Sequence, residues 1–212
     1  MTRESEFALA GGAALIARGD VDRKTRDLDY FSPNVAEIHS FVPEVESALR
    51  SAGFEVFRGL ESTTFVRLEV RDGTNVTEVD FGTDARLLPV ERSPFGPVIA
   101  GEELAVDKLL AVFGRAEPRD FIDLAAVSDR YGLENLAIKA IGKDAGFDPQ
   151  VFNSMLARFD RLLRQEFEIP DAAYERLERA VQRWRDLTID LTHDELDRQI
   201  GRDRGDDTGL EL

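Results

Sequence analysis

Two aspartates, Asp27 and Asp29, stand one residue apart in a segment that alternates polar and apolar side chains. On a β-strand, side chains at this spacing point to the same face and lie close together. Two adjacent carboxylates repel each other, and a divalent cation that prefers oxygen ligands, such as Mg²⁺, relieves that repulsion. The pair is therefore a candidate catalytic metal site. The alternative is an ordinary solvated strand face.

A third carboxylate, Asp80, occurs in a second alternating segment, Glu78-Val79-Asp80-Phe81. The alternation predicts that Val79 and Phe81 point into the core and that Asp80 points outward. Strand pairing could bring Asp80 beside the first two aspartates as a further metal ligand. Glu78 could equally be that ligand, or both side chains could belong to a solvated strand face.

Candidate phosphate-binding residues lie before the aspartate pair. Gly11 and Gly12 stand between a predicted strand and a predicted helix, where glycine lets a backbone approach a ligand closely. Arg23, Thr25 and Arg26 supply cations and a hydroxyl, which suit a triphosphate. The alternatives are a simple turn and a solvated basic loop.

Two further candidates, Lys108 and Asp123, lie in the second half of the chain. Lys108 has apolar neighbours on a predicted helix, so its stem is either buried near a site or simply snorkels past the core. Asp123 shares a helix face with Asp120, three residues earlier. These aspartates could instead form a capping and salt-bridging cluster with Arg115 and Arg119.

The composition restricts the available chemistry. Among the 212 residues there is no cysteine and there are two histidines, which excludes disulfides and thiolate chemistry and leaves a zinc site without its usual ligands. Any reaction would depend on Asp, Glu, Lys and Arg. The formal net charge of −15 disfavours nucleic-acid binding by the overall field, although local charge can differ.

No apolar run is long enough to span a bilayer, and the N-terminal residues lack the order of a signal peptide. We therefore expect a cytoplasmic protein without a membrane partner.

The hydrophobic pattern predicts an α+β fold with two domains. In residues 1–100 it predicts a mixed sheet with flanking helices, including a hairpin at Asp72-Gly73. The proline-containing stretch 83–97 is predicted as loop or linker. Residues 101–200 are predicted as a helical bundle that contributes Lys108 and Asp123, and residues 201–212 as a disordered tail.

The order of these motifs resembles the nucleotidyltransferase superfamily: a Gly-Gly helix start, an Asp-x-Asp strand and a later strand carboxylate. Residues from about 7 to 131 resemble the AbiEii/AbiGii family of abortive-infection toxins more specifically. Four blocks carry this resemblance: Leu9–Leu15, Arg23–Tyr30, Glu103–Val112 and Arg115–Leu124.

The resemblance implies roles for individual residues. Thr25 and Asp27 match the family's Ser/Thr-x-Asp motif, Lys108 matches a lysine that contacts the triphosphate, and Asp123 matches a late active-site aspartate. It implies a nucleoside triphosphate (NTP) as substrate and two Mg²⁺ ions held by Asp27, Asp29 and Asp80. It also implies a toxin that transfers a nucleotide to an RNA such as the tRNA 3′ end, and a cognate antitoxin.

Three alternatives stay open at this point. A small-molecule nucleotidyltransferase, for example one that modifies aminoglycosides, would use the same carboxylates, and an acidic cleft would suit a cationic acceptor. Phosphoryl transfer needs the same metal cradle. A non-catalytic nucleotide-binding partner protein is the third alternative, against which the complete set of candidate residues argues.

Overall fold

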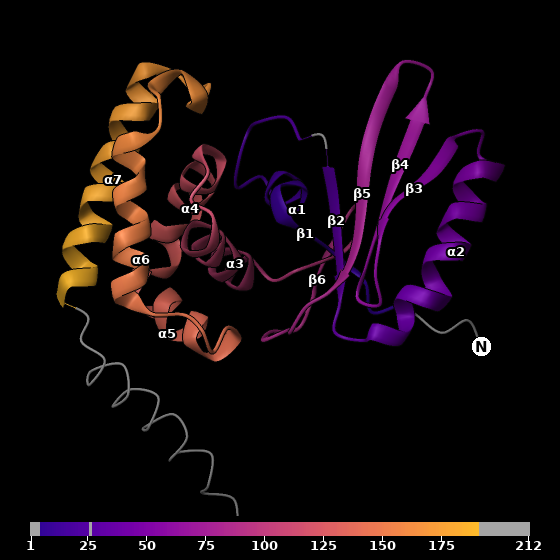
Figure 1. The fold of residues 1–212 in the computed structure, drawn as a ribbon, viewed down its shortest axis with the longest axis horizontal. Helices are drawn as coiled ribbons and strands as arrows, with labels where there is room; N and C mark the ends of the chain where they lie inside the picture. The colour runs from indigo at the N-terminus through magenta and orange to yellow at the C-terminus, as the bar shows by residue number, and fades with distance from the viewer. Residues whose placement is uncertain (1–4, 26, 191–212) are drawn as a thin grey trace, which may run out of the picture. The chain divides into compact units, whose positions relative to one another are not determined.

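The computed structural model describes residues 5–25 and 27–190, and the chain divides into two compact units, Met1–Leu104 and Ala105–Leu212 (Figure 1). Arg26 and the tail expected at 201–212 lie outside the described residues. The predicted fold class is confirmed: the first unit contains a mixed sheet with flanking helices, and the second is helical.

The first unit is built on a seven-stranded sheet with the order β3-β4-β5-β2-β1-β7-β6. Its central pair, β2 and β5, is parallel, as is the pair β1 and β7, and the other pairs are antiparallel. The strands are β1 (Ala8–Ala10), β2 (Asp27–Ser32), β3 (Glu55–Glu61), β4 (Phe65–Asp72), β5 (Asn75–Thr83), β6 (Glu91–Ser93) and β7 (Gly96–Val98).

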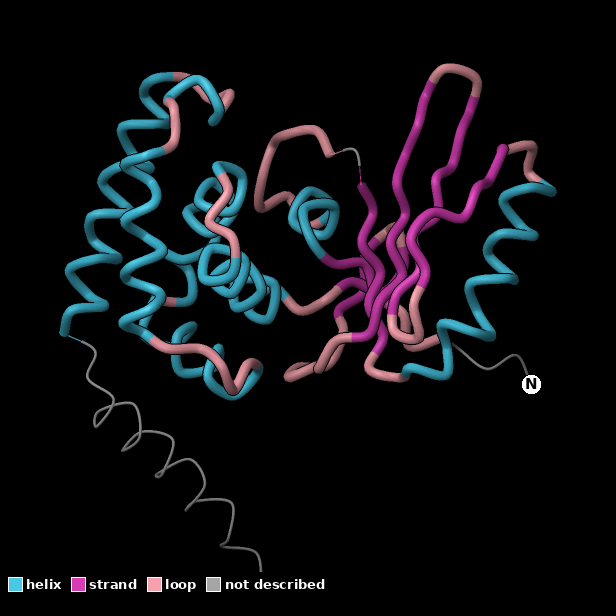
Figure 2. The backbone as a smooth tube through the Cα atoms, viewed as in Figure 1, coloured by secondary structure: helices cyan, strands magenta, loops and turns pink. Residues whose placement is uncertain are grey.

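The predicted hairpin at Asp72-Gly73 is confirmed as the connection between β4 and β5, the two longest strands (Figure 2). Asp72 pairs with Asn75 across a two-residue turn. Gly73 takes a φ of 59°, which lies in the region that glycine adopts without strain. This short turn fixes the register of the whole β4–β5 ladder.

Helix α2 (Val35–Ser51) covers one face of the sheet, and the short helix α1 (Gly11–Ala17) lies on the other (Figure 1). Ile38 and Val42 lie four residues apart on α2, and both are buried against strand residues such as Leu68, as expected for the apolar face of a helix. Asn34 caps α2 by accepting a hydrogen bond from the backbone N–H of Ala36 at 3.1 Å. The face opposite α2 is partly covered by α1, whose Ala14 and Leu15 are buried.

The proline-containing stretch was expected to be loop, and this expectation is wrong for two segments. Strands β6 and β7 form a small hairpin there, and Val98 of β7 pairs with Leu9 of β1. Ser93 stabilises the turn by donating to the carbonyl of Gly96 at 2.9 Å. The pairing with β1 joins residues far apart in sequence, so local composition could not reveal it.

The second unit is a helical bundle, as predicted. Helix α3 (Gly101–Gly114) leads into it, and α4 (Pro118–Tyr131), α5 (Leu133–Lys143), α6 (Pro149–Leu156) and α7 (Asp171–Asp190) follow, with 3₁₀ helices at Ala157–Arg161 and Arg164–Phe167. Leu177, Val181 and Trp184 recur at helical spacing and are buried on one face of α7. Within residues 5–25 and 27–190, no helix is long and apolar enough to cross a membrane.

Candidate active site

Four carboxylates meet on the sheet face opposite α2. The parallel register of β2 and β5 places Asp27 opposite Glu78 and Asp29 opposite Asp80. Neighbouring strands lie about 4.8 Å apart, so these side chains form a compact two-by-two array. Val79 is buried in the core on the α2 side, so the predicted alternation is confirmed.

The side chain of Asp27 is oriented by Thr25. The Thr25 hydroxyl donates a hydrogen bond to the Asp27 carboxylate. The two residues that match the Ser/Thr-x-Asp motif are therefore in direct contact. A hydroxyl in this position restricts the carboxylate to one rotamer.

The two candidate glycines each leave room for one side chain of the site. A β-carbon added to Gly11 would lie 1.9 Å from Oδ2 of Asp29, and one added to Gly12 would lie 2.5 Å from Nη2 of Arg23. Gly11 also has a φ of 60°. Position 11 thus requires glycine in this arrangement, whereas a side chain at position 12 would displace only the end of Arg23, a candidate phosphate ligand that lies beside the glycine turn.

Asp80 is held by an arginine that the sequence analysis missed. Arg67 of β4 donates from Nε and Nη2 to the two carboxylate oxygens of Asp80, at 2.7 Å each. Its Nη1 lies 3.0 Å from Glu78. The hydrogen bonds to Asp80 raise the pKa of Arg67, so its guanidinium stays charged at any physiological pH. The hairpin register, which places Arg67 opposite Asp80, was the signal that could have revealed this pair.

Lys108 and Asp123 form an ion pair within the second unit. Lys108 Nζ lies 2.9 Å from Asp123 Oδ2, and their side chains are only 9% and 1% exposed. A buried lysine with one close carboxylate has a fixed position, which a merely snorkelling lysine lacks. Asp120 has a different role: it accepts two hydrogen bonds from Arg115 at 2.9 and 2.8 Å and belongs to the capping box of α4.

The oxygen donors on β2 suit a hard divalent cation. Asp27 and Asp29 point to the same face, and carboxylates are preferred ligands of Mg²⁺. In the described part of the chain, no group of three or more His, Asp or Glu side chains is arranged to hold a metal ion. The β2 aspartates are the pair of oxygen donors that would hold such an ion, whereas Asp80 is engaged by Arg67.

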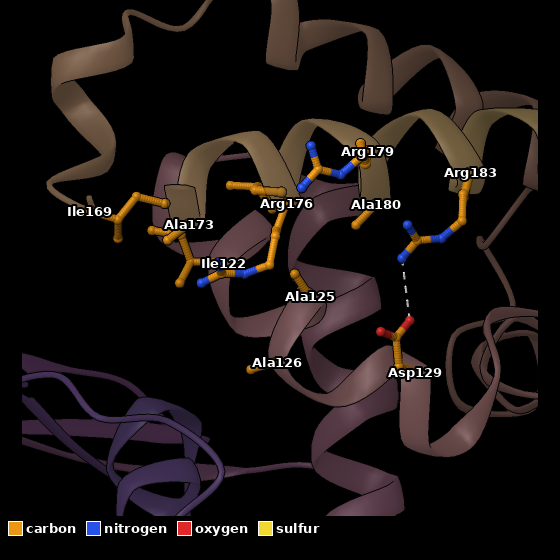
Figure 3. Close-up of a pocket in the computed structure, with 11 residues that line it drawn as sticks. Ile122, Ala125, Ala126, Asp129, Ile169, Ala173, Arg176, Arg179, Ala180 and Arg183 are labelled. Atoms are coloured by element: carbon orange, nitrogen blue, oxygen red, sulfur yellow. Dashed lines mark hydrogen bonds and ion pairs between the residues drawn. The ribbon is translucent and has the colours of Figure 1, made fainter. Parts of the chain in front are cut away.

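A pocket of about 430 Å³ lies between α4 and α7 in the second unit (Figure 3). Its floor is apolar, and three exposed arginines of α7 line it, namely Arg176, Arg179 and Arg183. Arg183 lies 3.5 Å from Asp129, whereas no ion pair joins Arg176 or Arg179 to another residue that the structure describes. None of the candidate residues from the sequence lines this pocket.

Residues 2–202 match the family described as nucleotidyl transferase AbiEii toxin, type IV toxin–antitoxin system. The chain belongs to this family. The resemblance inferred from the motifs is thereby confirmed. Membership of the AbiEii family makes the chain a nucleotidyltransferase. The family description also implies an NTP substrate and an antitoxin partner.

Solved structures share the fold of this AbiEii chain. MenT4, a nucleotidyltransferase toxin of Mycobacterium tuberculosis H37Rv, has a TM-score of 0.63 and 24% sequence identity over 91% of this chain and 78% of that chain. JHP933 from Helicobacter pylori has a TM-score of 0.50 and 20% identity over 95% of this chain and 90% of that chain. At these identities the likeness shows the fold alone. No curated protein matches the sequence.

Proposed function

We propose that this AbiEii-family chain transfers a nucleoside monophosphate from an NTP to the 3′ end of an RNA, with tRNA as acceptor, and acts in the cytoplasm as a magnesium-dependent toxin. One observation carries the proposal. Asp27 and Asp29 share one face of β2, with Asp27 oriented by Thr25 and Asp29 seated against Gly11. This is the arrangement expected of a carboxylate pair that serves a metal and a triphosphate.

The reaction forms a bond from the acceptor hydroxyl oxygen to the α-phosphorus and breaks the bond from the α-phosphorus to the bridging oxygen. Pyrophosphate leaves with that oxygen, and the hydroxyl proton passes to solvent. Mg²⁺, when bound by Asp27 and Asp29, supplies Lewis acidity at the phosphates. Thr25 keeps Asp27 in its rotamer, which limits the reorganisation of that carboxylate during transfer, and Gly11 leaves the space that Asp29 occupies.

The phosphate ligands in this proposal are arginine and lysine side chains. Arg23 lies beside Gly12 and is a ligand for the triphosphate, and Arg26 has the same proposed role on sequence grounds. Lys108 is proposed to contact the triphosphate and to balance charge that develops on the leaving pyrophosphate. Its buried ion pair with Asp123 supports this, because the pair fixes the ammonium group in advance.

RNA binding by a chain with a net charge of −15 needs a locally basic surface. The α4–α7 pocket offers one. Arg176 and Arg179 are exposed, are 3 residues apart on α7, and could each bind a phosphate of the RNA backbone. We therefore propose this pocket as part of the RNA-binding surface.

The proposal is tested by incubating the purified protein with Mg²⁺, total RNA and each labelled NTP in turn. The critical variant is Asp27→Asn, which keeps the size of the side chain. The control is Glu44→Gln, which neutralises an exposed carboxylate on α2, across the sheet from the site. Label on tRNA-sized RNA with the wild type and the control, and none with Asp27→Asn, is the expected result.

Two other results have distinct meanings. Full labelling by Asp27→Asn would show that the metal assignment is wrong. Magnesium-dependent NTP binding without any labelled RNA would contradict the RNA acceptor and favour a small-molecule acceptor on the same carboxylates. Labelling with the γ-phosphate of the NTP would indicate phosphoryl rather than nucleotidyl transfer.

A further inference from the structure

The four-carboxylate array has one built-in cation. Arg67 contacts both β5 members of the array, with Asp80 bound through two hydrogen bonds and Glu78 at 3.0 Å. Asp29, which pairs with Asp80 in the register, also acts on Arg67 electrostatically. The array is thus divided by strand: the β5 carboxylates contact Arg67, whereas on β2 Asp29 lies beside Gly11 and Asp27 accepts a hydrogen bond from Thr25.

Arg67 is held in place by residues of its own hairpin and of the adjoining strand β3. A β-carbon at Gly59 would lie 3.5 Å from Cγ of Arg67, so the stem of the arginine lies along the β3 backbone at a residue with no side chain. Its Cζ lies 6.0 Å from the centre of the Phe65 ring. The guanidinium therefore has a defined position before any ligand binds.

Asp80 would lose its hydrogen bonds with Arg67 if its carboxylate turned toward a metal ion. Its side chain is 9% exposed, and both of its oxygens already accept charge-assisted hydrogen bonds at 2.7 Å. Breaking this bidentate pair would forfeit both of these hydrogen bonds and leave Arg67, whose side chain is 39% exposed, with Glu78 and water as partners. A Mg²⁺ ion readily keeps water in place of a missing protein ligand, so it has little need of Asp80.

We propose that Arg67 replaces a metal ion as the counter-charge of Asp80, so that Asp80 is a positioning residue and metal is bound by the Asp27–Asp29 pair. This inference rests on the proposed function for the role of that pair. Because Arg67 neutralises the β5 carboxylates, they do not compete for the metal ion. The metal ion is then bound by Asp27 and Asp29 on β2. The chain then departs from the superfamily pattern, in which the later strand carboxylate binds metal.

The experiment measures Mn²⁺ binding to the full chain by electron paramagnetic resonance, without nucleotide. The decisive variant is Arg67→Gln/Asp80→Asn, which removes both charges of the pair and leaves the net charge unchanged. We expect its Mn²⁺ affinity to stay close to that of the wild type. In contrast, Asp27→Asn should weaken binding by about tenfold or more, as the loss of a ligand does.

Two single variants sharpen the result. Arg67→Gln frees Asp80 and Glu78 and should add Mn²⁺ capacity that the wild type lacks. Arg67→Lys keeps the positive charge and should show the stoichiometry of the wild type. A purely structural role for Arg67 would change the thermal stability of these variants but not their Mn²⁺ stoichiometry, so both are measured.

The outcomes separate this inference from the proposed function. If the double variant loses Mn²⁺ affinity as severely as Asp27→Asn while its circular dichroism stays native, Asp80 is a metal ligand and the inference is overturned. If instead Asp27→Asn binds Mn²⁺ as well as the wild type, the metal assignment of the proposed function fails, and the inference falls with it.

Discussion

The carboxylate of Asp29 lies against the α-carbon of Gly11, in the space that any larger residue at position 11 would need. A β-carbon there would lie 1.9 Å from Oδ2 of Asp29. The glycine turn before α1 and the position of Asp29 on β2 therefore depend on each other, because a side chain at position 11 would displace the Asp29 carboxylate. Loss of the glycine should act directly on the proposed metal ligand.

Gly11→Ala should impair both stability and transfer. The substitution meets a φ of 60° and displaces Asp29, so we expect a loss of about 2 kcal/mol or more in the free energy of unfolding and about a hundredfold loss of labelling. Gly19→Ala is the matched control, because Gly19 has a φ of 75° but no atom within 4 Å of the added carbon. The Gly19→Ala variant should lose some stability and keep its transfer activity. Equal activity of the two variants would contradict the role given to Gly11.

Asp123→Asn should leave the buried charge of Lys108 without its counter-charge at position 123 and lower the free energy of unfolding by about 3 kcal/mol. Adding Lys108→Met in the same chain removes that charge and should recover most of the stability. It should not recover transfer, because the phosphate contact is lost. Urea unfolding and RNA labelling of the two single variants and the double variant form the test. Activity that returned with stability would show that the pair is only structural.

The double variant Arg176→Glu/Arg179→Glu should weaken RNA binding and leave NTP binding unchanged. Loss of two phosphate contacts predicts that the KM for RNA rises about tenfold and that the salt dependence of KM becomes shallower. The control, Arg158→Glu/Arg161→Glu, makes the same change of charge at exposed arginines outside the pocket. If the control raises KM equally, overall charge rather than the α4–α7 pocket governs RNA binding.

The ion pair between Glu46 and Arg58 should make the first unit less stable in acid. Hydrogen bonds from Arg58 lower the pKa of Glu46 below its ordinary value of 4.5. A lowered pKa in the folded state contributes stability above the unfolded pKa, and this contribution disappears as the pH falls through the folded value. The pair contributes about 1 kcal/mol, because the partly exposed Arg58 is screened by water.

Arg58→Gln is the variant that tests this pH dependence. It should lose that stability at neutral pH and differ little from the wild type well below pH 4.5. Arg92→Gln, at an exposed position on the edge strand β6, is the control and should follow the wild type throughout. A constant difference between Arg58→Gln and the wild type at all pH values would show that packing, not charge, is responsible.

The local sequence pattern is enough to predict features that depend on neighbouring residues, such as the β4–β5 hairpin. The turn at Gly73 sets Asp72 opposite Asn75, and from there the antiparallel register follows residue by residue to Arg67 and Asp80. Helical spacing likewise marks the buried face of α7, and Pro118 lies in the first turn of α4, where proline is tolerated. The Arg67–Asp80 pair could therefore have been predicted, had the register been carried down the hairpin.

Pairings between distant segments could not be predicted in this way. Nothing in the alternation of β2 indicates that it lies beside β5, or that Asp29 lies opposite Asp80, because a helix and a hairpin intervene. The addition of β6 and β7 to the sheet depends equally on a distant partner, β1. The family resemblance brought Asp27, Lys108 and Asp123 together as candidates where the residues by themselves left alternatives open.

The parallel pairing of β2 with β5 also determines when the carboxylate face can exist during synthesis. The hairpin and α2 can form as soon as their own residues emerge, since their contacts are local. The array of Asp27, Asp29 and Asp80 requires β5 to insert beside a strand made much earlier, so it cannot form until translation has passed Thr83. A growing chain consequently lacks the complete carboxylate array until this late strand is in place.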